Sequence, residues 1–245
     1  KSPAFKYCFN TLERIWNTVK NRTDFKVVYD NWEKYLRVTY GSLIGSEELF
    51  LRHSYLAVFT KLIVYMRLEE SNSVPSTEII IKILDGEFFS EQGIDNFLEE
   101  DFFSWIARGQ TKKTALDISS KIINQLANYN LRELSEDILK SLYQELVDPE
   151  TRHDLGEYYT PDWLAQRMIE HILKDNPSAS VLDPSCGSGT FLYMTIRHKR
   201  QALGLKKEPL EHIISNVVGI DILPLAVITA KTHYLLALGD LLMQR

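Results

Sequence analysis

The stretch VLDPSCGSGTFL, residues 181–192, decides how the second half of the chain is expected to fold. An apolar run ends at Asp183, a turn contains Gly187 and Gly189, and Thr190 begins a helix-like segment. In an open parallel sheet, ligands bind beyond the carboxyl ends of the strands, at the turn that leads into a helix. We therefore expect a ligand here that suits a carboxylate and a close approach of the backbone.

The neighbouring segments predict a strand, helix, strand, helix unit. Apolar runs at 180–183 and 216–223 predict strands, and residues 190–203 and 226–238 predict helices. This order is typical of parallel strands joined by a crossover helix. Both faces of a parallel sheet must be covered, so two strands alone suggest the front part of a larger protein. Before them, residues 162–173 predict an amphipathic helix with one apolar side, formed by Trp163, Leu164, Met168, Ile169 and Ile172.

The first half of the chain has a different, purely helical pattern. Apolar residues recur there at spacings of three and four, and Ser76 and Thr111 provide helix start signals. The β-branched run at 78–84 is compatible with a strand, but its flanks favour a short buried helix. We expect helices at 3–20, 24–40, 47–70, 77–85, 93–108, 111–129 and 135–147.

Composition and charge narrow the class of protein. The net charge is −5, with 18 Lys+Arg against 23 Asp+Glu in residues 1–150 and 10 of each in residues 151–245, so a basic nucleic-acid-binding footprint is missing. Cys8 and Cys186 form no paired pattern, and the six histidines have no metal-ligand spacing, so we expect neither disulfides nor a metal site. The most apolar segment, 49–68, contains charged residues and is expected to be a core helix, not a membrane span. With no signal-like start, the expected location is cytoplasmic and no membrane partner is expected.

The chemistry of the turn argues for one kind of ligand. CGSGT lacks the third glycine of a dinucleotide-binding loop and the lysine of a P-loop. Asp183 disfavours phosphate and favours an ammonium or sulfonium group, and Asp221 follows the second strand, where a ribose diol is held in this topology. Ile222 can then cover an adenine ring. Together these features predict S-adenosylmethionine as the cofactor.

Three motifs carry a resemblance to a known family. GEYYTP (156–161), DPSCGSGTF (183–191) and GIDILPLA (219–226) occur in the order found in adenine-N6 DNA methyltransferases of restriction-modification systems. The chain resembles the modification subunits of type I enzymes and their fused type II relatives, over roughly residues 135–240. The helical pattern predicts a helical domain at 1–150. The strand and helix order predicts an incomplete, Rossmann-like α/β sheet with at least two parallel strands at 151–245, and the resemblance implies that this part is the cofactor-binding half of a methyltransferase domain.

The resemblance also implies roles for individual residues. Asp183 would bind the methionine amino group, and Asp221 would hold the ribose hydroxyls while Ile222 packs on adenine. The alternative to ligand binding is that the Asp221 carboxylate only caps the following helix. The methionine moiety would be enclosed by the loop and, from the other side, by the end of the first motif, that is, by Pro184, Ser185, Cys186, Gly187, Gly189, Tyr159, Thr160 and Pro161. For the last motif, the alternative is that Thr160 simply caps a helix.

One departure from the family matters. Its catalytic tetrapeptide, Asn or Asp followed by Pro-Pro and Tyr or Phe, is absent, and the only Asn-Pro is Asn176-Pro177, followed by Ser178. In the family this motif binds the flipped target base. We therefore expect no catalytic residue in this chain, and cofactor binding without methyl transfer. DNA is the expected partner through the whole protein, with a specificity or restriction subunit or a fused recognition domain.

Two alternatives remain open from the residues. The methyl acceptor could be RNA or a protein side chain, because a cofactor site does not identify it. The chain could also be a non-catalytic module that docks DNA or another subunit. The one basic cluster, residues 197–207, fits either a helix C-terminus or a nucleic-acid contact.

Overall fold

A computed structural model of the chain describes residues 2–40, 45–94, 97, 102–129, 131, 160–204 and 208–244. The chain divides into two compact units. The described residues up to 131 belong to the first, here the N-terminal unit, and those from 160 onward belong to the second, the C-terminal unit. The expected domain boundary at residue 150 and the expected helix at 135–147 lie outside the described residues.

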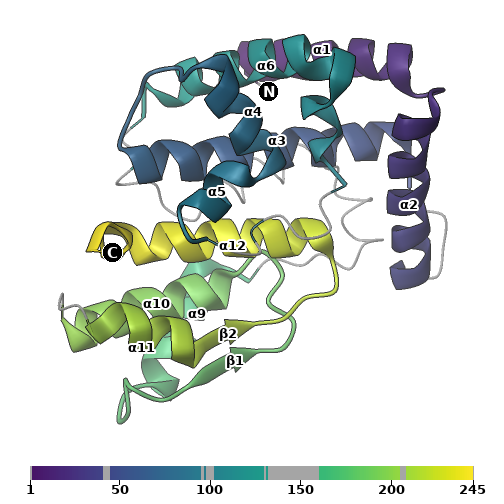
Figure 1. Ribbon diagram of the computed structural model, residues 1–245. Coiled ribbons are helices and arrows are strands. Elements are labelled where there is room, and N and C mark those ends of the chain that lie inside the picture. Colours follow the sequence, from purple (N-terminus) through teal and green to yellow (C-terminus); the bar gives the residue numbers. More distant parts are fainter. Residues whose placement is uncertain are drawn as a thin grey trace. The chain divides into compact units, whose positions relative to one another are not determined.

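The N-terminal unit is helical throughout its described part. Ser46 and Ser76 each accept a hydrogen bond from a first-turn backbone N–H, so α3 and α4 begin where a capping serine stands. The favoured helix at 78–84 is confirmed. The elements are α1 (Pro3–Val19), α2 (Thr23–Tyr40), α3 (Glu47–Glu69), α4 (Thr77–Asp85), α5 (Glu87–Glu91), the 3₁₀ turns η1 (Ser104–Ala107) and η2 (Gly109–Thr111), and α6 (Lys112–Leu126) (Figure 1).

The predicted helix at 93–108 is wrong. Its described residues form turns and η1, and all four residues of η1 are buried. Gly93 and Gly109 have positive φ angles, which interrupt a helix on either side. Thr111 stands at the N-cap position of α6, as expected, but its hydroxyl donates back to preceding carbonyl groups and does not cap the helix.

Aromatic side chains from separate helices meet at the centre of the N-terminal unit. The Phe50 ring lies 5.0 Å from the Trp16 ring and 5.2 Å from the Trp32 ring, between centroids. Trp105 packs on Trp16 and donates its indole N–H to the Ser54 hydroxyl at 2.9 Å. The expected core helix is confirmed, because α3 is buried on every side. By length and composition alone, α3 and the segment Pro224–Leu242 could each cross a membrane, but a core helix passes the same test and 94% of the α3 window is buried.

The C-terminal unit contains a small parallel sheet with helices against it. Strand β1 (Val181–Asp183) pairs with β2 (Val217–Gly219), with Leu182 opposite Val218. The helices are α9 (Asp162–Ile172), α10 (Thr190–Leu203), α11 (Glu208–Asn216) and α12 (Pro224–Leu238), followed by η3 (Gly239–Gln244). Helix α10 packs on α9, on α12 and on both strands (Figure 1). The predicted strand–helix–strand–helix order is confirmed, with α11 as an additional, unpredicted helix.

The apolar side predicted for the helix at 162–173 differs from the buried one. Ala165, Ile169 and Leu173 are buried at spacings of four, whereas Trp163 is 69% exposed and Ile172 is 65% exposed. Neighbouring elements decide which side is buried, since α9 packs on α10, and of the predicted side only Ile169 is buried. Apolar side chains are also exposed on the sheet, since Leu182 and its partner Val218 both face solvent.

Candidate functional site

The turn after β1 and the turn after β2 lie side by side at the same end of the sheet. Backbone pairing continues past the strands, because Ile220 N–H donates to the Asp183 carbonyl and Cys186 N–H donates to the Ile220 carbonyl, both at 2.9 Å. Parallel strands therefore bring residues 183–189 and 220–223 together, although more than 30 residues separate them in sequence. This juxtaposition is the centre of the candidate site.

Asp221 links the two turns through its carboxylate. Its Oδ2 accepts a hydrogen bond from Gly187 N–H at 2.8 Å, and its Oδ1 accepts one from Leu223 N–H at 2.9 Å. Leu223 is the N-cap residue of α12, so the Asp221 carboxylate also stabilises the start of this helix, as in the alternative role expected from the sequence. A carboxylate has about four acceptor positions, so two hydrogen bonds leave room for ligand hydroxyl groups.

Asp183 ends β1 and faces the start of the turn. Its Oδ1 accepts a hydrogen bond from Ser185 N–H at 3.2 Å, a distance that is long for a charge-assisted bond. Pro184 and Ser185 are exposed beside it. The Asp183 carboxylate is thus held in orientation but keeps most of its acceptor capacity.

Cys186 belongs to this turn, and the pKa of its thiol reflects the burial and charges around it. Burial, and then the nearby carboxylates of Asp221 and Asp183, raise the pKa of the thiol to about 12. The thiol therefore stays protonated near neutral pH and is no nucleophile. The same two carboxylates make the site suited to a cation and unsuited to a phosphate group.

Gly187 and Gly189 have different roles in the turn. Both have positive φ angles, +53° at Gly187 and +91° at Gly189. A Cβ atom on Gly189 would stand 2.9 Å from the Ala230 Cα, whereas nothing lies within 4 Å of a Cβ on Gly187. Gly189 thus permits close packing of the turn on α12, and Gly187 leaves open space above the turn.

Most backbone N–H groups of the turn are already used within the protein. Ser185, Cys186 and Gly187 donate as described above, and Gly189 N–H donates to the Cys186 carbonyl at 2.8 Å. Within the part of the chain that the structure describes, Ser188 N–H has no acceptor. It precedes the N-terminus of α10, whose N-cap residue Gly189 provides no side-chain cap.

The structure describes the remaining predicted site residues in less detail. Ile222 is 66% exposed just after Asp221. Pro161 is the N-cap residue of α9, so the alternative in which Thr160 caps that helix is wrong. Tyr159 lies outside the described residues. Asn176-Pro177 lies before β1, where the Pro177 carbonyl accepts a hydrogen bond from the buried Lys199 ammonium at 2.8 Å.

No role in the site was predicted from the sequence for Gly219, Ala230 or His233, although Gly219 begins the GIDILPLA motif. Gly219 allows Leu192 and Cys186 to pack on β2, because a Cβ there would meet Leu192 Cδ1 at 2.5 Å. Ala230 receives Gly189, and His233, fully buried in α12, lies 2.6 Å from the Ser188 carbonyl oxygen through its Nδ1. Among the described residues, no three His, Cys, Asp or Glu side chains are grouped as a metal site requires.

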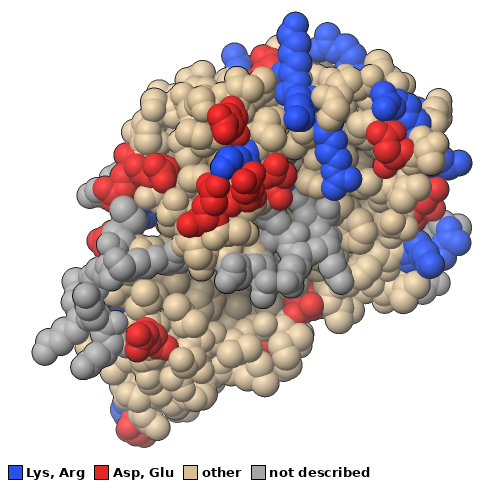
Figure 2. All heavy atoms as spheres, viewed as in Figure 1, with Lys and Arg blue, Asp and Glu red and all other residues tan. Residues whose placement is uncertain are grey.

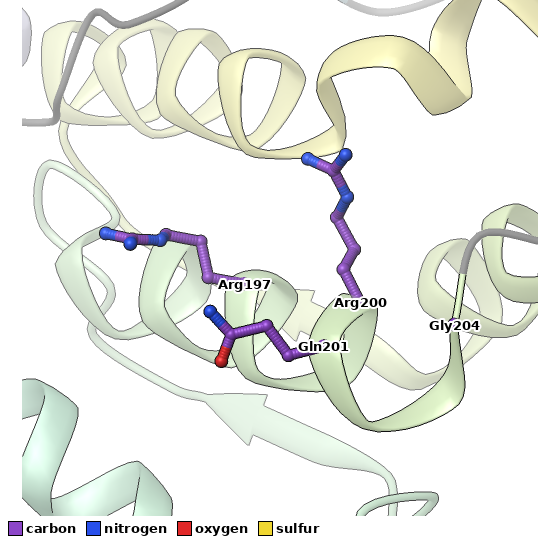
Figure 3. Close-up of a pocket in the computed structure, with 4 residues that line it drawn as sticks. All are labelled: Arg197, Arg200, Gln201 and Gly204. Atoms are coloured by element: carbon purple, nitrogen blue, oxygen red, sulfur yellow. The ribbon is translucent and has the colours of Figure 1, made fainter.

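The basic segment 197–207 is mostly engaged in structure where it is described. Arg200 donates to the Ala237 carbonyl near the end of α12 at 2.6 Å, and Lys199 is buried. Figure 3 shows the surface pocket that Arg197 and Arg200 line together with Gln201 and Gly204, at the C-terminal half of α10. On the face in Figure 2, Lys and Arg side chains lie mainly in the upper and right-hand part, Asp and Glu side chains lie beside them, and the lower part shows few charged residues.

Comparison with known proteins supports the motif-based reading of the C-terminal part. Residues 134–235 match the family described as N-6 DNA Methylase. A protein of Methanocaldococcus jannaschii, named as a type II restriction enzyme and methyltransferase, is 26% identical over an alignment that covers 69% of this chain. The chain spans only 18% of that relative's length. No solved structure matches the chain. These findings confirm the resemblance to N6-adenine DNA methyltransferases of restriction-modification systems.

Proposed function

We propose that this chain is the cofactor-binding part of an S-adenosylmethionine-dependent DNA adenine-N6 methyltransferase of a restriction-modification system. The observation that carries the proposal is the placement of Asp183 and Asp221 on either side of a glycine turn, after adjacent parallel strands. Two carboxylates around an open backbone turn suit a ligand that combines ammonium, sulfonium and ribose hydroxyl groups. When bound, this cofactor supplies a methyl group from a sulfonium.

In this proposal each feature of the site binds one part of the cofactor. Asp183 binds the amino group, and the Ser188 N–H with the N-terminus of α10 suits the carboxylate of the methionine moiety. Asp221 accepts hydrogen bonds from the ribose diol with its remaining lone pairs, and the exposed Ile222 covers adenine. Thr160 and Pro161, with Tyr159, close the methionine side.

The whole protein's activity extends beyond the residues of this chain. The sequence has no Asn/Asp-Pro-Pro-Tyr/Phe motif to hold a flipped adenine, so we propose that this chain alone binds cofactor and does not transfer methyl. The exposed pair Leu182 and Val218 fits a Rossmann-like sheet that further helices cover. DNA, and a specificity or restriction component, are the proposed partners, and the proposed location is the cytoplasm.

Calorimetric titration of the chain with S-adenosylmethionine tests the cofactor site directly. We expect saturable binding by the wild type, and at least a tenfold weaker affinity in Asp183→Ala, because a charged hydrogen bond contributes about 1.5–3 kcal/mol. Asp175→Ala removes an exposed carboxylate shortly before β1 and is the matched control, with unchanged affinity expected. No binding by the wild type, or equal binding by Asp183→Ala, would contradict the assignment.

A further inference from the structure

We infer that His233 is a positioning residue that fixes the cofactor turn from beneath, an inference that rests on the proposed function. His233 lies in α12, is fully buried, and places its Nδ1 2.6 Å from the carbonyl oxygen of Ser188, 45 residues earlier. A carbonyl oxygen only accepts hydrogen bonds, so Nδ1 must carry the proton. The imidazole is therefore a hydrogen-bond donor to the centre of the turn.

This hydrogen bond fixes one peptide unit completely. The peptide between Ser188 and Gly189 has its C=O held by His233 and its N–H held by the Cys186 carbonyl. Because the peptide group is planar, two bonds at opposite ends leave it no rotation. A flip of this peptide would change φ of Gly189, which is +91° and places the turn against Ala230.

The neighbouring peptide groups of the turn are held by other hydrogen-bond acceptors, except for one N–H group. Ile220 holds the N–H of Cys186, and Asp221 holds the N–H of Gly187. The peptide between Gly187 and Ser188 carries the one N–H of the turn that has no acceptor within the described residues. With its neighbours fixed by Asp221 and His233, this N–H has a defined orientation before any ligand arrives, which favours binding.

The ring of His233 is itself oriented by packing. Tyr193 of α10 contacts it edge-on, with the ring centroids 6.3 Å apart, and both side chains are buried. The donor is thus part of the α10–α12 interface. We expect its effect on cofactor affinity to pass through the Ser188 carbonyl, to which it donates.

Two variants separate the hydrogen bond from packing. His233→Leu removes the donor, and we expect it to weaken S-adenosylmethionine binding by up to about tenfold, because the Ser188 N–H is then no longer held in its binding orientation before the ligand arrives. His233→Asn keeps an N–H donor near the Nδ1 position, and we expect affinity within about threefold of wild type. Thr232→Val is the matched control, because Thr232 is equally buried in α12 but bonds its own helix at Ile228.

Calorimetric titration with S-adenosylmethionine measures the affinity of each variant, and the thermal midpoint of unfolding measures its stability. The inference is supported if His233→Leu loses affinity while His233→Asn keeps it and Thr232→Val lowers only the midpoint. Equal affinity in wild type and His233→Leu overturns it. If the wild type does not bind, the proposed function fails first, which is a distinct result.

A ¹⁵N nuclear magnetic resonance spectrum of the wild-type histidines tests the geometry without any ligand. We expect Nδ1 of His233 to carry a proton, with the resonance assigned by its loss in His233→Asn. The Nε2–H tautomer would overturn the inference even if His233→Leu fails to fold.

Discussion

The two units of this protein differ in where they place their large apolar side chains. In the N-terminal unit, the Trp16, Phe50 and Trp105 rings contact one another and are buried. In the C-terminal unit, Trp163, Leu182 and Ile222 are each more than half exposed. The first unit thus uses these central rings for stability, whereas the second leaves apolar surface at its sheet and near its proposed ligand site.

A pair of tryptophan substitutions gives the largest expected contrast between the units. Trp105→Ala removes a fully buried ring and its hydrogen bond to Ser54, and should destabilise the N-terminal unit by about 3–5 kcal/mol. Trp163→Ala, on an exposed ring, should change stability by less than about 0.5 kcal/mol. Urea unfolding followed by peptide-resolved hydrogen exchange measures each unit separately. Equal losses for the two variants would abolish the contrast.

The glycine turn offers the next largest effect, within the C-terminal unit. Gly189→Ala combines a positive φ with a Cβ only 2.9 Å from Ala230, and should cost about 2–4 kcal/mol. Gly187→Ala has the same backbone problem without the steric one and should cost about 1 kcal/mol. Hydrogen exchange of peptides from residues 190–204 reports the difference. A similar loss of stability in both variants would show that Ala230 shifts readily to make room for the added Cβ atom.

Each unit contains a buried lysine that donates to backbone carbonyl groups. Lys199 donates to the Pro177 and Ala179 carbonyls, and Lys61 donates to the Leu84 carbonyl. Burial lowers the pKa of Lys199, so its charge is retained against a desolvation cost. Lys199→Met should destabilise its unit by about 1.5–3 kcal/mol, because carbonyl groups lose a charged donor.

Lys61→Met is expected to cause a loss of similar size in the N-terminal unit. The exposed Lys174→Met is the matched control and should stay within about 0.5 kcal/mol of wild type. Thermal unfolding curves compare the three variants. A Lys199→Met protein as stable as the control would mean that water replaces the ammonium at those carbonyls.

The smallest effect near neutral pH comes from His53 in the N-terminal unit. Burial lowers the pKa of His53 to about 3, below an unfolded value of about 6.5. Stability from its neutral form is complete above pH 6.5 and is lost as the pH falls toward 3, at about 1.4 kcal/mol per pH unit. His53→Leu should therefore show a flatter decline of the thermal midpoint between pH 6.5 and 4. Parallel curves for wild type and variant would argue against a buried neutral imidazole.

The sequence by itself determined most helices of the described N-terminal unit, the order of strands and helices around residues 181–238, and the family resemblance. These features depend on local periodicity, capping serines such as Ser76, and contiguous motifs, all of which are written in neighbouring residues. The proposed ligand residues Asp183 and Asp221 were also found this way, because each follows an apolar run directly.

Only the tertiary structure decided how the site is held and which surfaces are buried. The bonds from Gly187 to Asp221 and from His233 to Ser188 join residues 34 and 45 positions apart, and no local pattern records them. The buried stripe of α9 and the irregular turns at 102–111 likewise depend on neighbouring elements. Packing and hydrogen bonding between distant segments choose among conformations that local preferences leave nearly equal in free energy.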